Sequence, residues 1–293
     1  MSTLRLRASA VCRADGKLLV VRLRDPVTGV EALYPPGGGV EPGESPAVTA
    51  ERETFEETGL RVTVESGSEH VLRHPFRWAG VDYDVTTHYF GASLPRAEAL
   101  SAVDDAAYHL GASWLPLEDG LDAMAIHRDI ASAVAHVVRT ADRQAWTRHP
   151  NAGGPAAMLL GIHDQFRVAC ERLRFLAAEP ARADGGWLAR SFEPLARTLH
   201  HHHQAEEALL FPFVARAGAA PARLVGDHGE LTRAIAAVEA SLAGGADLGP
   251  ARAALETFEH VLVTHLDREE RLVVPLLLAL SPAEAWAAVH DPT

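Results

Sequence analysis

Three glutamates stand close together near the end of one predicted helix in the first half of the chain. Glu53, Glu56 and Glu57 are spaced i, i+3 and i+4, so a helix places their carboxylates on one face. Three crowded carboxylates repel one another unless a cation neutralises them, and hard cations accept carboxylate oxygens as ligands. The alternative is a solvated acidic helix face, which is the usual meaning of a glutamate run.

The residues before these glutamates favour a metal site over a solvated face. Gly38 is the middle one of three consecutive glycines, where the backbone can approach a ligand closely. Arg52 can orient one glutamate through a charge-assisted hydrogen bond. With Glu44, these residues fall at the spacing of the Nudix box in GGVEPGESPAVTAERETFEETGL, residues 38–60, and the segment resembles that family.

The resemblance to the Nudix family implies a mixed sheet with flanking helices and a hydrolase that cleaves nucleoside diphosphate derivatives. It implies that Mg²⁺ or Mn²⁺ activates the attacking water and polarises the phosphates. The residues implied as metal ligands are Gly38, Glu53, Glu56 and Glu57. Arg52 joins the three glutamates in the catalytic set, Glu44 braces Arg52, and either Glu53 or Glu56 acts as the base.

The substrate stays open. Arg73, Phe76 and Trp78 lie on or beside a predicted strand. They either contact a base or ribose or are ordinary core and surface residues, so no substrate-binding residue is assigned.

A second set of potential ligands lies in the last part of the chain, where nine of the sixteen histidines follow residue 160. Four segments there repeat apolar residues in steps of three and four, which predicts helices with an apolar seam facing a bundle core. A histidine interrupts every seam, and a glutamate follows two of these histidines by four residues. The six polar seam residues are His163, His202, Glu206, His228, His265 and Glu269.

Metal coordination removes the cost of burying these six groups, which is several kcal/mol for each unpaired charge. The sequence also repeats. LLGIHDQF echoes LVGDHGEL, and HHQAEEALLFP echoes HLDREERLVVP, so each repeat supplies two histidines and one glutamate to a two-metal site. Nitrogen and carboxylate ligands in a bundle core favour iron or manganese.

This pattern resembles the hemerythrin-like HHE cation-binding family. The resemblance implies two iron ions with the glutamates as bridges. Oxygen-carrying members have a further histidine on the third helix, where this chain has Thr232, so we expect a di-iron centre that senses or reacts with O₂, NO or peroxide. Cys170 is expected as a core residue. The histidines expected off the seam, at the surface or behind the ligands, are His200, His201, His203 and His260.

Two different scaffolds must position these residues. The first half has an α+β pattern, with a hairpin turn at Asp15-Gly16 and a loop at residues 34–44 that leads into a helix ending at Gly59. Another helix is expected from residue 120 to about 139. Strands are expected at residues 5–12, 17–23, 61–65 and 81–90.

The second half predicts an all-α up-down four-helix bundle, because four long helical patterns follow one another with short connections. Turns are expected near residues 183–186, 217–221 and 244–250, and the seam of the second helix continues through Leu209. Periodicity lapses at residues 141–155, which we assign as a linker between a domain of residues 1–140 and a domain of residues 156–293.

The composition fits a globular chain of two domains. It has 293 residues, 47% of them hydrophobic, and no apolar run approaches the roughly 20 residues of a membrane helix. The net charge of -12 argues against nucleic-acid binding and suits metal-chelated phosphates. Cys12 and Cys170 form no CxxC unit, and the N-terminus has no signal-peptide pattern, so we expect a cytoplasmic protein.

We therefore expect a Mg²⁺-dependent Nudix-type pyrophosphohydrolase joined to a di-iron bundle for redox or gas sensing or for iron handling. The alternative is a metal-binding or sensor protein whose first domain only binds a nucleotide. The intact Arg52, Glu53, Glu56 and Glu57 favour catalysis. Which nucleotide derivative is cleaved, which metal the bundle holds and the oligomeric state stay open.

Overall fold

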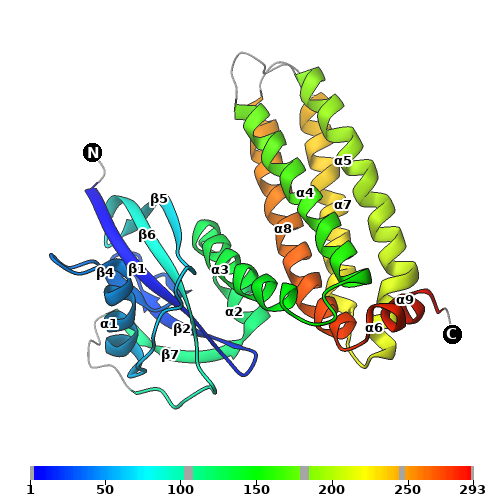
Figure 1. Cartoon of the computed structure of the whole chain (residues 1–293). Helices are drawn as coiled ribbons and strands as arrows, with labels where there is room; N and C mark the ends of the chain where they lie inside the picture. Colours follow the sequence, from blue (N-terminus) through cyan, green and yellow to red (C-terminus); the bar gives the residue numbers. More distant parts are fainter. Residues whose placement is uncertain (1–2, 102–107, 179–184, 244–247, 292–293) are drawn as a thin grey trace. The chain divides into compact units, whose positions relative to one another are not determined.

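The computed structural model describes residues 3–101, 108–178, 185–243 and 248–291. The chain divides into two compact units, Met1–Arg143 and Gln144–Thr293 (Figure 1). Each unit has hydrophobic cores of its own.

The first unit is built on a mixed sheet. Its strands are β1 (Thr3–Ala14), β2 (Lys17–Arg24), β3 (Glu31–Tyr34), β4 (Gly37–Gly39), β5 (His70–Trp78), β6 (Val81–Ser93) and β7 (His109–Pro116). The order is β3-β2-β1-β6-β5, with β4 paired to β1 and β7 to β2. Only β1 and β6 pair in parallel among the described strands. Asp15 and Gly16 make the expected hairpin turn, both at positive φ.

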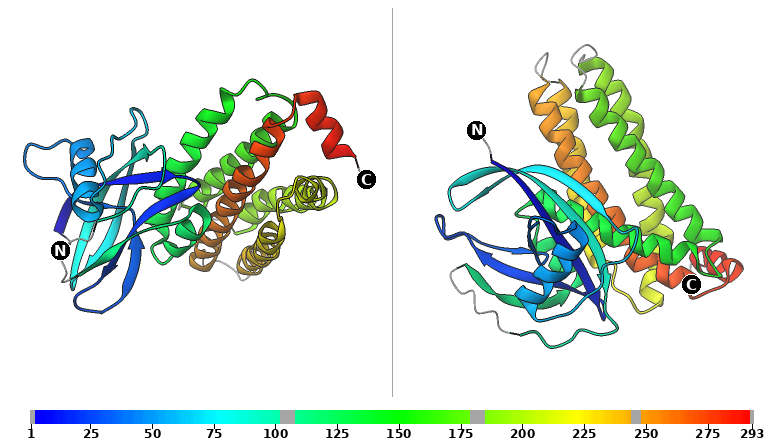
Figure 2. Two further views of the ribbon diagram at one scale, coloured as in Figure 1. Left: turned by 90° about the horizontal axis from the view of Figure 1, so that it is seen from below. Right: turned by 60° about the vertical axis from the view of Figure 1, so that its left-hand side comes forward.

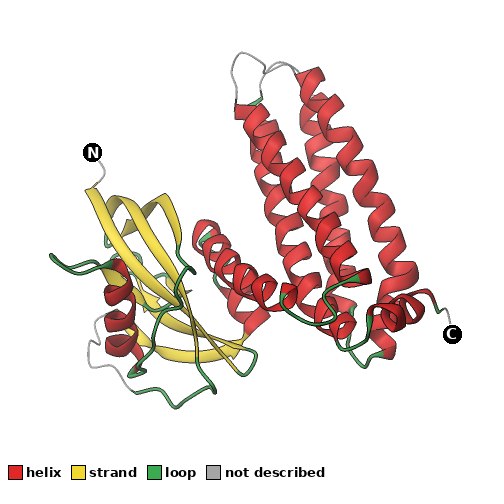
Figure 3. Ribbon diagram, in the orientation of Figure 1, coloured by secondary structure: helices red, strands yellow, loops and turns green. Residues whose placement is uncertain are grey.

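Helices cover both faces of this sheet (Figure 3). Successive residues of a strand point to opposite faces, so Ala8 and Ala10 of β1 pack with α1 (Pro46–Thr58), whereas Val11 packs with α3 (Arg128–Thr147). The short helix α2 (Leu117–Ala123) lies on the α3 side. The α+β architecture with flanking helices is confirmed, and α1 ends at Gly59 as expected.

The strand expected at residues 61–65 is wrong. This extended segment forms no ladder: the Val64 N–H donates to Glu51 Oε1 at 3.0 Å, and the Glu65 N–H donates to Gly91 O at 2.8 Å. Its alternating valines pack beside α1, which explains why the pattern imitates a strand.

The helix expected from residue 120 to 139 is two helices, α2 and α3. Met124, at the break, is fully buried, and the His127 Nε2 and Tyr34 hydroxyl are 2.7 Å apart, so the chain turns there to fill the core and reach β3. Helix α3 then runs to Thr147, into the segment assigned as a linker. Within the loop expected at residues 34–44, three glycines pair with β1 as β4.

The second unit contains four long helices, α4 (Gly154–Ala178), α5 (Gly185–Ala205), α7 (Ala222–Ala243) and α8 (Gly249–Leu278). Helices α4 and α7 each pack against both α5 and α8, and successive long helices run in opposite directions (Figure 1, Figure 2). Two shorter helices, α6 (Phe211–Arg216) and α9 (Pro282–His290), lie at one end. The expected turn at 217–221 separates α6 from α7, while residues 183–184 and 244–247 lie outside the described residues.

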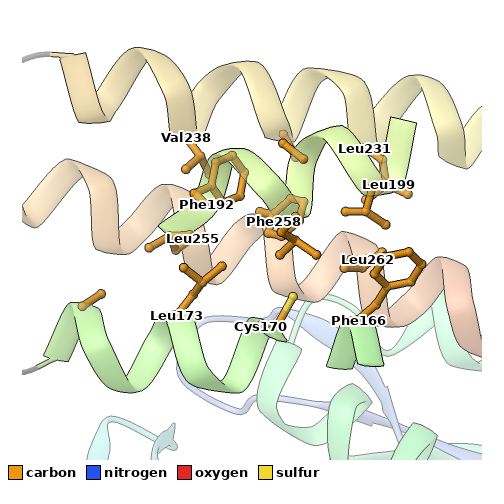
Figure 4. Close-up of a cluster of buried hydrophobic side chains, with 14 of the residues drawn as sticks. Phe166, Cys170, Leu173, Phe192, Leu199, Leu231, Val238, Leu255, Phe258 and Leu262 are labelled. Atoms are coloured by element: carbon orange, nitrogen blue, oxygen red, sulfur yellow. The ribbon is translucent and has the colours of Figure 1, made fainter. Parts of the chain in front are cut away.

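The four helices share one apolar core (Figure 4). Phe192 of α5 and Phe258 of α8 meet edge to face with ring centroids 5.2 Å apart, a favoured aromatic geometry. Cys170 of α4 is buried in the same cluster, as expected for a core residue. The apolar seams therefore do face one another across the bundle.

A π-helical turn, Glu206–Leu210, connects α5 to α6. It corrects the expected seam: Leu209 is 39% exposed, whereas Leu210 is 8% exposed. Leu210 follows Glu206 by four residues, where the expected seam took the step of three, and Phe213 beyond it is buried; both steps lie on the core-facing stripe of a helix. Pro212, two residues beyond the turn, lacks the N–H that would bond back into it.

None of the described helices is by itself long and apolar enough to cross a bilayer, and α8 with α9 would meet that length only jointly, across a bend of 117°.

Candidate functional site

Helix α1 and strand β4 bring the predicted glutamates to the sheet. Ser45 caps α1 by accepting a hydrogen bond from the Val48 N–H (3.4 Å), and Gly59 ends the helix at a φ of 75°. Glu53 lies directly against Gly38, because a β-carbon at position 38 would come within 2.1 Å of the Glu53 carboxyl carbon. The absence of a side chain at Gly38 therefore lets this carboxylate reach the backbone of β4.

Arg52 ties the carboxylates to one another. Its Nε and Nη2 donate to the two oxygens of Glu44 at 2.8 and 3.1 Å, and these bonds lower the pKa of Glu44 to about 2. Its Nη1 donates to Glu53 Oε1 at 3.0 Å and to Glu56 Oε2 at 2.9 Å. Glu56 is 54% exposed, so it faces solvent and is linked to Glu53 through the guanidinium.

Glu53 and Glu57 are poorly solvated carboxyl groups. Burial raises the pKa of Glu57 to about 8, against the effect of the Gly37 N–H, which donates to Oε2 at 2.9 Å. Burial also raises the pKa of Glu53, which Arg52 partly offsets. A divalent cation stabilises ionised carboxylates in such surroundings, so these residues fit the cation that the sequence implies.

A pocket adjoins Glu53 and Glu57, and it contains residues that the sequence reasoning missed. Arg7 is partly buried, its Nη2 donates to Gly37 O at 2.8 Å, and its charge acts on both glutamates. Arg5 lines the same pocket. The two arginines stand two apart on β1, which puts both on one face of the sheet, and that spacing is the signal that could have found them.

Aromatic side chains line the pocket as well. Phe76 and Trp78 of β5 lie parallel within 11°, with centroids 6.4 Å apart, and Tyr34 of β3 meets Phe76 edge to face at 6.3 Å. The structure thus brings two of the three residues considered for substrate contact to the pocket. Arg73 is 67% exposed and pairs with Asp84, with Nε 2.9 Å from Oδ1.

The six polar seam residues, joined by His203, converge inside the bundle as two groups that share Glu206. Potential ligand atoms lie within 4.8 Å of one another in each group. One group is His163, His202, Glu206 and Glu269, and the other is His203, Glu206, His228 and His265. His202 Nε2 is 2.5 Å from Glu206 Oε1, and His228 Nε2 is 3.1 Å from Glu206 Oε2, so the two oxygens face different groups.

Many of these buried atoms have no aligned hydrogen-bond partner. They include both carboxylate oxygens of Glu206 and Glu269 and the Nε2 atoms of His203, His228 and His265. Each unsatisfied buried group costs about 1–3 kcal/mol, so a cluster of them is stable only if something else binds them. Nitrogen and carboxylate donors converging in this way fit two metal ions of the iron or manganese type.

Carboxylates hold two of the histidines from behind: Glu270 lies 2.9 Å from His163 Nδ1, and Glu207 lies 2.8 Å from His228 Nδ1. A third carboxylate, Asp227, lies 3.7 Å from His265 Nδ1, beyond hydrogen-bond distance. Arg167 binds Glu270 at 2.8 Å, and Arg268 binds Asp227 at 2.6 Å. A carboxylate on Nδ1 fixes the ring so that Nε2 faces a metal.

His203 does not lie where the sequence predicted. It is 7% exposed and faces the centre rather than the surface, and burial, aided by the charge of His228, lowers its pKa to about 3. The ring is therefore neutral, the form that binds metals. His200 and His201 are exposed and His260 is partly buried, consistent with positions off the seam.

Comparison with known proteins gives one match for each unit. Residues 3–134 match the NUDIX domain, and residues 154–277 match the hemerythrin HHE cation binding domain. No curated protein matches this chain.

Among solved structures, an Ap4A hydrolase from C. elegans in a binary complex is 20% identical, with a TM-score of 0.39, over 47% of this chain and 98% of that one. The MutT protein of Methanosarcina mazei Go1 is also 20% identical, with a TM-score of 0.38, over 48% of this chain and 96% of that one. Sequence identities and TM-scores this low do not indicate which substrate this chain binds.

Proposed function

We propose that this chain, which joins a NUDIX hydrolase domain to a hemerythrin HHE cation binding domain, cleaves the pyrophosphate linkage of a nucleoside diphosphate derivative and carries a di-iron centre. One observation supports the hydrolase more than any other. Glu53 lies against the backbone of Gly38, and Glu57 accepts a hydrogen bond from the Gly37 N–H, at a pocket that also holds Arg7 and aromatic rings. Such a pocket offers cation ligands, a phosphate partner and stacking surfaces together.

The residues of the site on α1 and β4 have separate roles in the proposed hydrolysis. Glu53, Glu56 and Glu57, with the carbonyl of Gly38, hold the cation, and Arg52 keeps two of these glutamates oriented. Bound Mg²⁺ or Mn²⁺ supplies charge that polarises the phosphates and lowers the pKa of the attacking water. Glu53 or Glu56 accepts the proton from that water.

The pocket residues bind the rest of the substrate. Arg7 and Arg5 are cations beside the carboxylates, and arginine suits phosphate oxygens through its planar fork of donors. Phe76 and Trp78 provide ring faces for a nucleobase, a contact worth roughly 1–3 kcal/mol per base.

A substrate screen tests the hydrolase. The protein with Mg²⁺ is offered nucleoside di- and triphosphates, ADP-ribose, dinucleotide cofactors and oxidised nucleotides, and release of phosphate or pyrophosphate products is measured. We expect at least one of them to be cleaved only when the divalent cation is present. Cleavage of none would exclude the proposal.

The bundle centre is proposed to hold two iron ions. His163, His202, Glu206, His228, His265 and Glu269 are the proposed ligands, and the unsatisfied atoms among them support it. Position 232 is a threonine, whose hydroxyl bonds to the backbone of its own helix, to His228 O at 2.9 Å. The centre therefore has fewer nitrogen donors on α7 than an oxygen carrier, which favours reaction with or sensing of O₂, NO or peroxide.

Iron binding is tested on the full chain. Anaerobic reconstitution with Fe(II), removal of loosely bound metal and elemental analysis should leave close to two iron ions per chain. Background iron alone would contradict the proposed centre. We place the boundary between the two activities in the segment 141–155.

A further inference from the structure

The bundle is built from a sequence repeat, and among the buried histidines of the described bundle residues His203 has no histidine counterpart in the other repeat. When His202 is set against His265, Glu206 falls against Glu269 and Pro212 against Pro275. In this register His203 stands opposite Leu266, which is fully buried. The second repeat thus fills this core position with an apolar side chain, whereas the first repeat fills it with an imidazole.

His203 lies inside the cluster of ligand atoms. Its ring stacks on that of His228 with centroids 4.0 Å apart and meets that of His265 at 5.5 Å. One of its ring nitrogens lies within 4.8 Å of ligand atoms of His228, His265 and Glu206.

A core-filling role does not explain this side chain. Its Nε2 is buried and has no hydrogen-bond partner among the described residues, so the imidazole carries a desolvation cost that leucine would avoid. His201, the preceding residue, is exposed and carries no such cost. A cation bound by Nε2 offsets this desolvation cost, so metal coordination explains a buried histidine at this position.

We propose that His203 is a seventh ligand of the di-metal centre and that it makes the two metal positions chemically different. One position takes His203, His228, His265 and Glu206. The other takes His163, His202, Glu206 and Glu269. This inference rests on the proposed di-iron function and adds the inequivalence of the two ions.

The two positions differ in donor type. Three nitrogens and one carboxylate surround the first, whereas two nitrogens and two carboxylates surround the second. Imidazole suits iron, cobalt and zinc, and carboxylates suit harder ions such as manganese. The three-histidine position therefore retains iron or cobalt more tightly, and the carboxylate-rich position releases such an ion first.

The test is His203→Leu, which copies Leu266 of the other repeat, with His201→Leu as the matched control. Each full-length variant is titrated with Fe(II) without oxygen, and separately with Co(II), whose visible absorption reports its nitrogen and oxygen ligands. We expect the parent and His201→Leu to bind two ions of unequal affinity. In His203→Leu the tighter site should weaken by on the order of tenfold or more, since losing even an outer partner of a ligand costs 10–100-fold, and its cobalt spectrum should change.

Stability of the metal-free protein separates ligation from a structural role. Because leucine removes an unpaired buried nitrogen, metal-free His203→Leu should be at least as stable as the metal-free parent. Two ions bound with parental affinity and an unchanged cobalt spectrum would overturn the inference while leaving the di-iron proposal intact. A less stable metal-free variant would also overturn it, whereas failure of the parent to bind metal would overturn both.

Discussion

A single atom that is absent, the β-carbon of residue 38, decides how closely Glu53 approaches strand β4. The carboxyl group occupies the space where that atom would stand. Carboxyl groups sit at the end of a flexible side chain, so Glu53 can move away at little cost to the fold. Position 38 therefore controls the geometry of the site and has little effect on stability.

This gives a matched pair of variants. Gly38→Ala should displace Glu53 and lower turnover by on the order of 10²-fold, the effect of misplacing a reacting group by about 1 Å, while the melting temperature stays close to that of the parent. Gly39→Ala is the control, because the nearest atom to its new β-carbon is Arg5 Nη2 at 4.0 Å. Equal turnover in both variants would refute the role of Gly38.

The sequence revealed some residues of this site and not others for a physical reason. The spacing i, i+3 and i+4 alone puts Glu53, Glu56 and Glu57 on one face of a helix. The pocket residues Arg7 and Phe76 belong to β1 and β5, which are separated in the sheet by β6. Their proximity depends on sheet topology, which local patterns do not contain.

At the scale of elements, the seam after Glu206 continues through Leu210, within the π-helical turn, and Phe213, which are both buried. The four apolar seams were predicted correctly because steps of three and four follow from the α-helix itself. The prediction failed at Leu209 because Leu209 and Leu210 stand three and four residues after Glu206, and an apolar pattern does not distinguish two adjacent leucines that both fit its steps. His203 was misjudged because the expected seam took only the step of three from Leu199 to His202, although the position four after Leu199 lies on the same core-facing stripe.

The register of this turn can be measured through stability. Leu210→Ala should lower the free energy of unfolding of the helical unit by about 2–5 kcal/mol, the usual cost of truncating a buried leucine. Leu209→Ala should cost well under half of that, because this side chain is 39% exposed. Denaturant titration of both metal-free variants compares them, and the reverse order would contradict the buried position of Leu210.

At the scale of the whole molecule, two units with different candidate metal sites share one chain. If the bundle regulates the hydrolase, its oxidised and reduced forms must differ in how they affect that domain, since a ligand without differential affinity shifts nothing. Typical coupling of about 1–3 kcal/mol corresponds to roughly 5- to 150-fold in substrate affinity.

A double variant tests this regulation. His202→Ala with His265→Ala should empty the bundle centre while Glu53, Glu56 and Glu57 stay unchanged. We expect a competent hydrolase whose KM no longer depends on oxidant or reductant, with the iron-loaded parent measured alongside. Identical kinetics of the parent in its oxidised, reduced and iron-free forms would instead mean that the two domains act independently.

The central claim is that a cation held by the carboxylates of α1 performs the hydrolysis, and Glu57→Gln tests it most directly. Glutamine keeps the shape of the side chain and resembles the protonated acid that burial favours, so the fold should be retained. Loss of a metal carboxylate should lower Mg²⁺-dependent turnover of the best substrate by roughly 10²-fold or more, while the exposed control Glu41→Gln keeps the parental rate. Parental turnover in Glu57→Gln would contradict the claim.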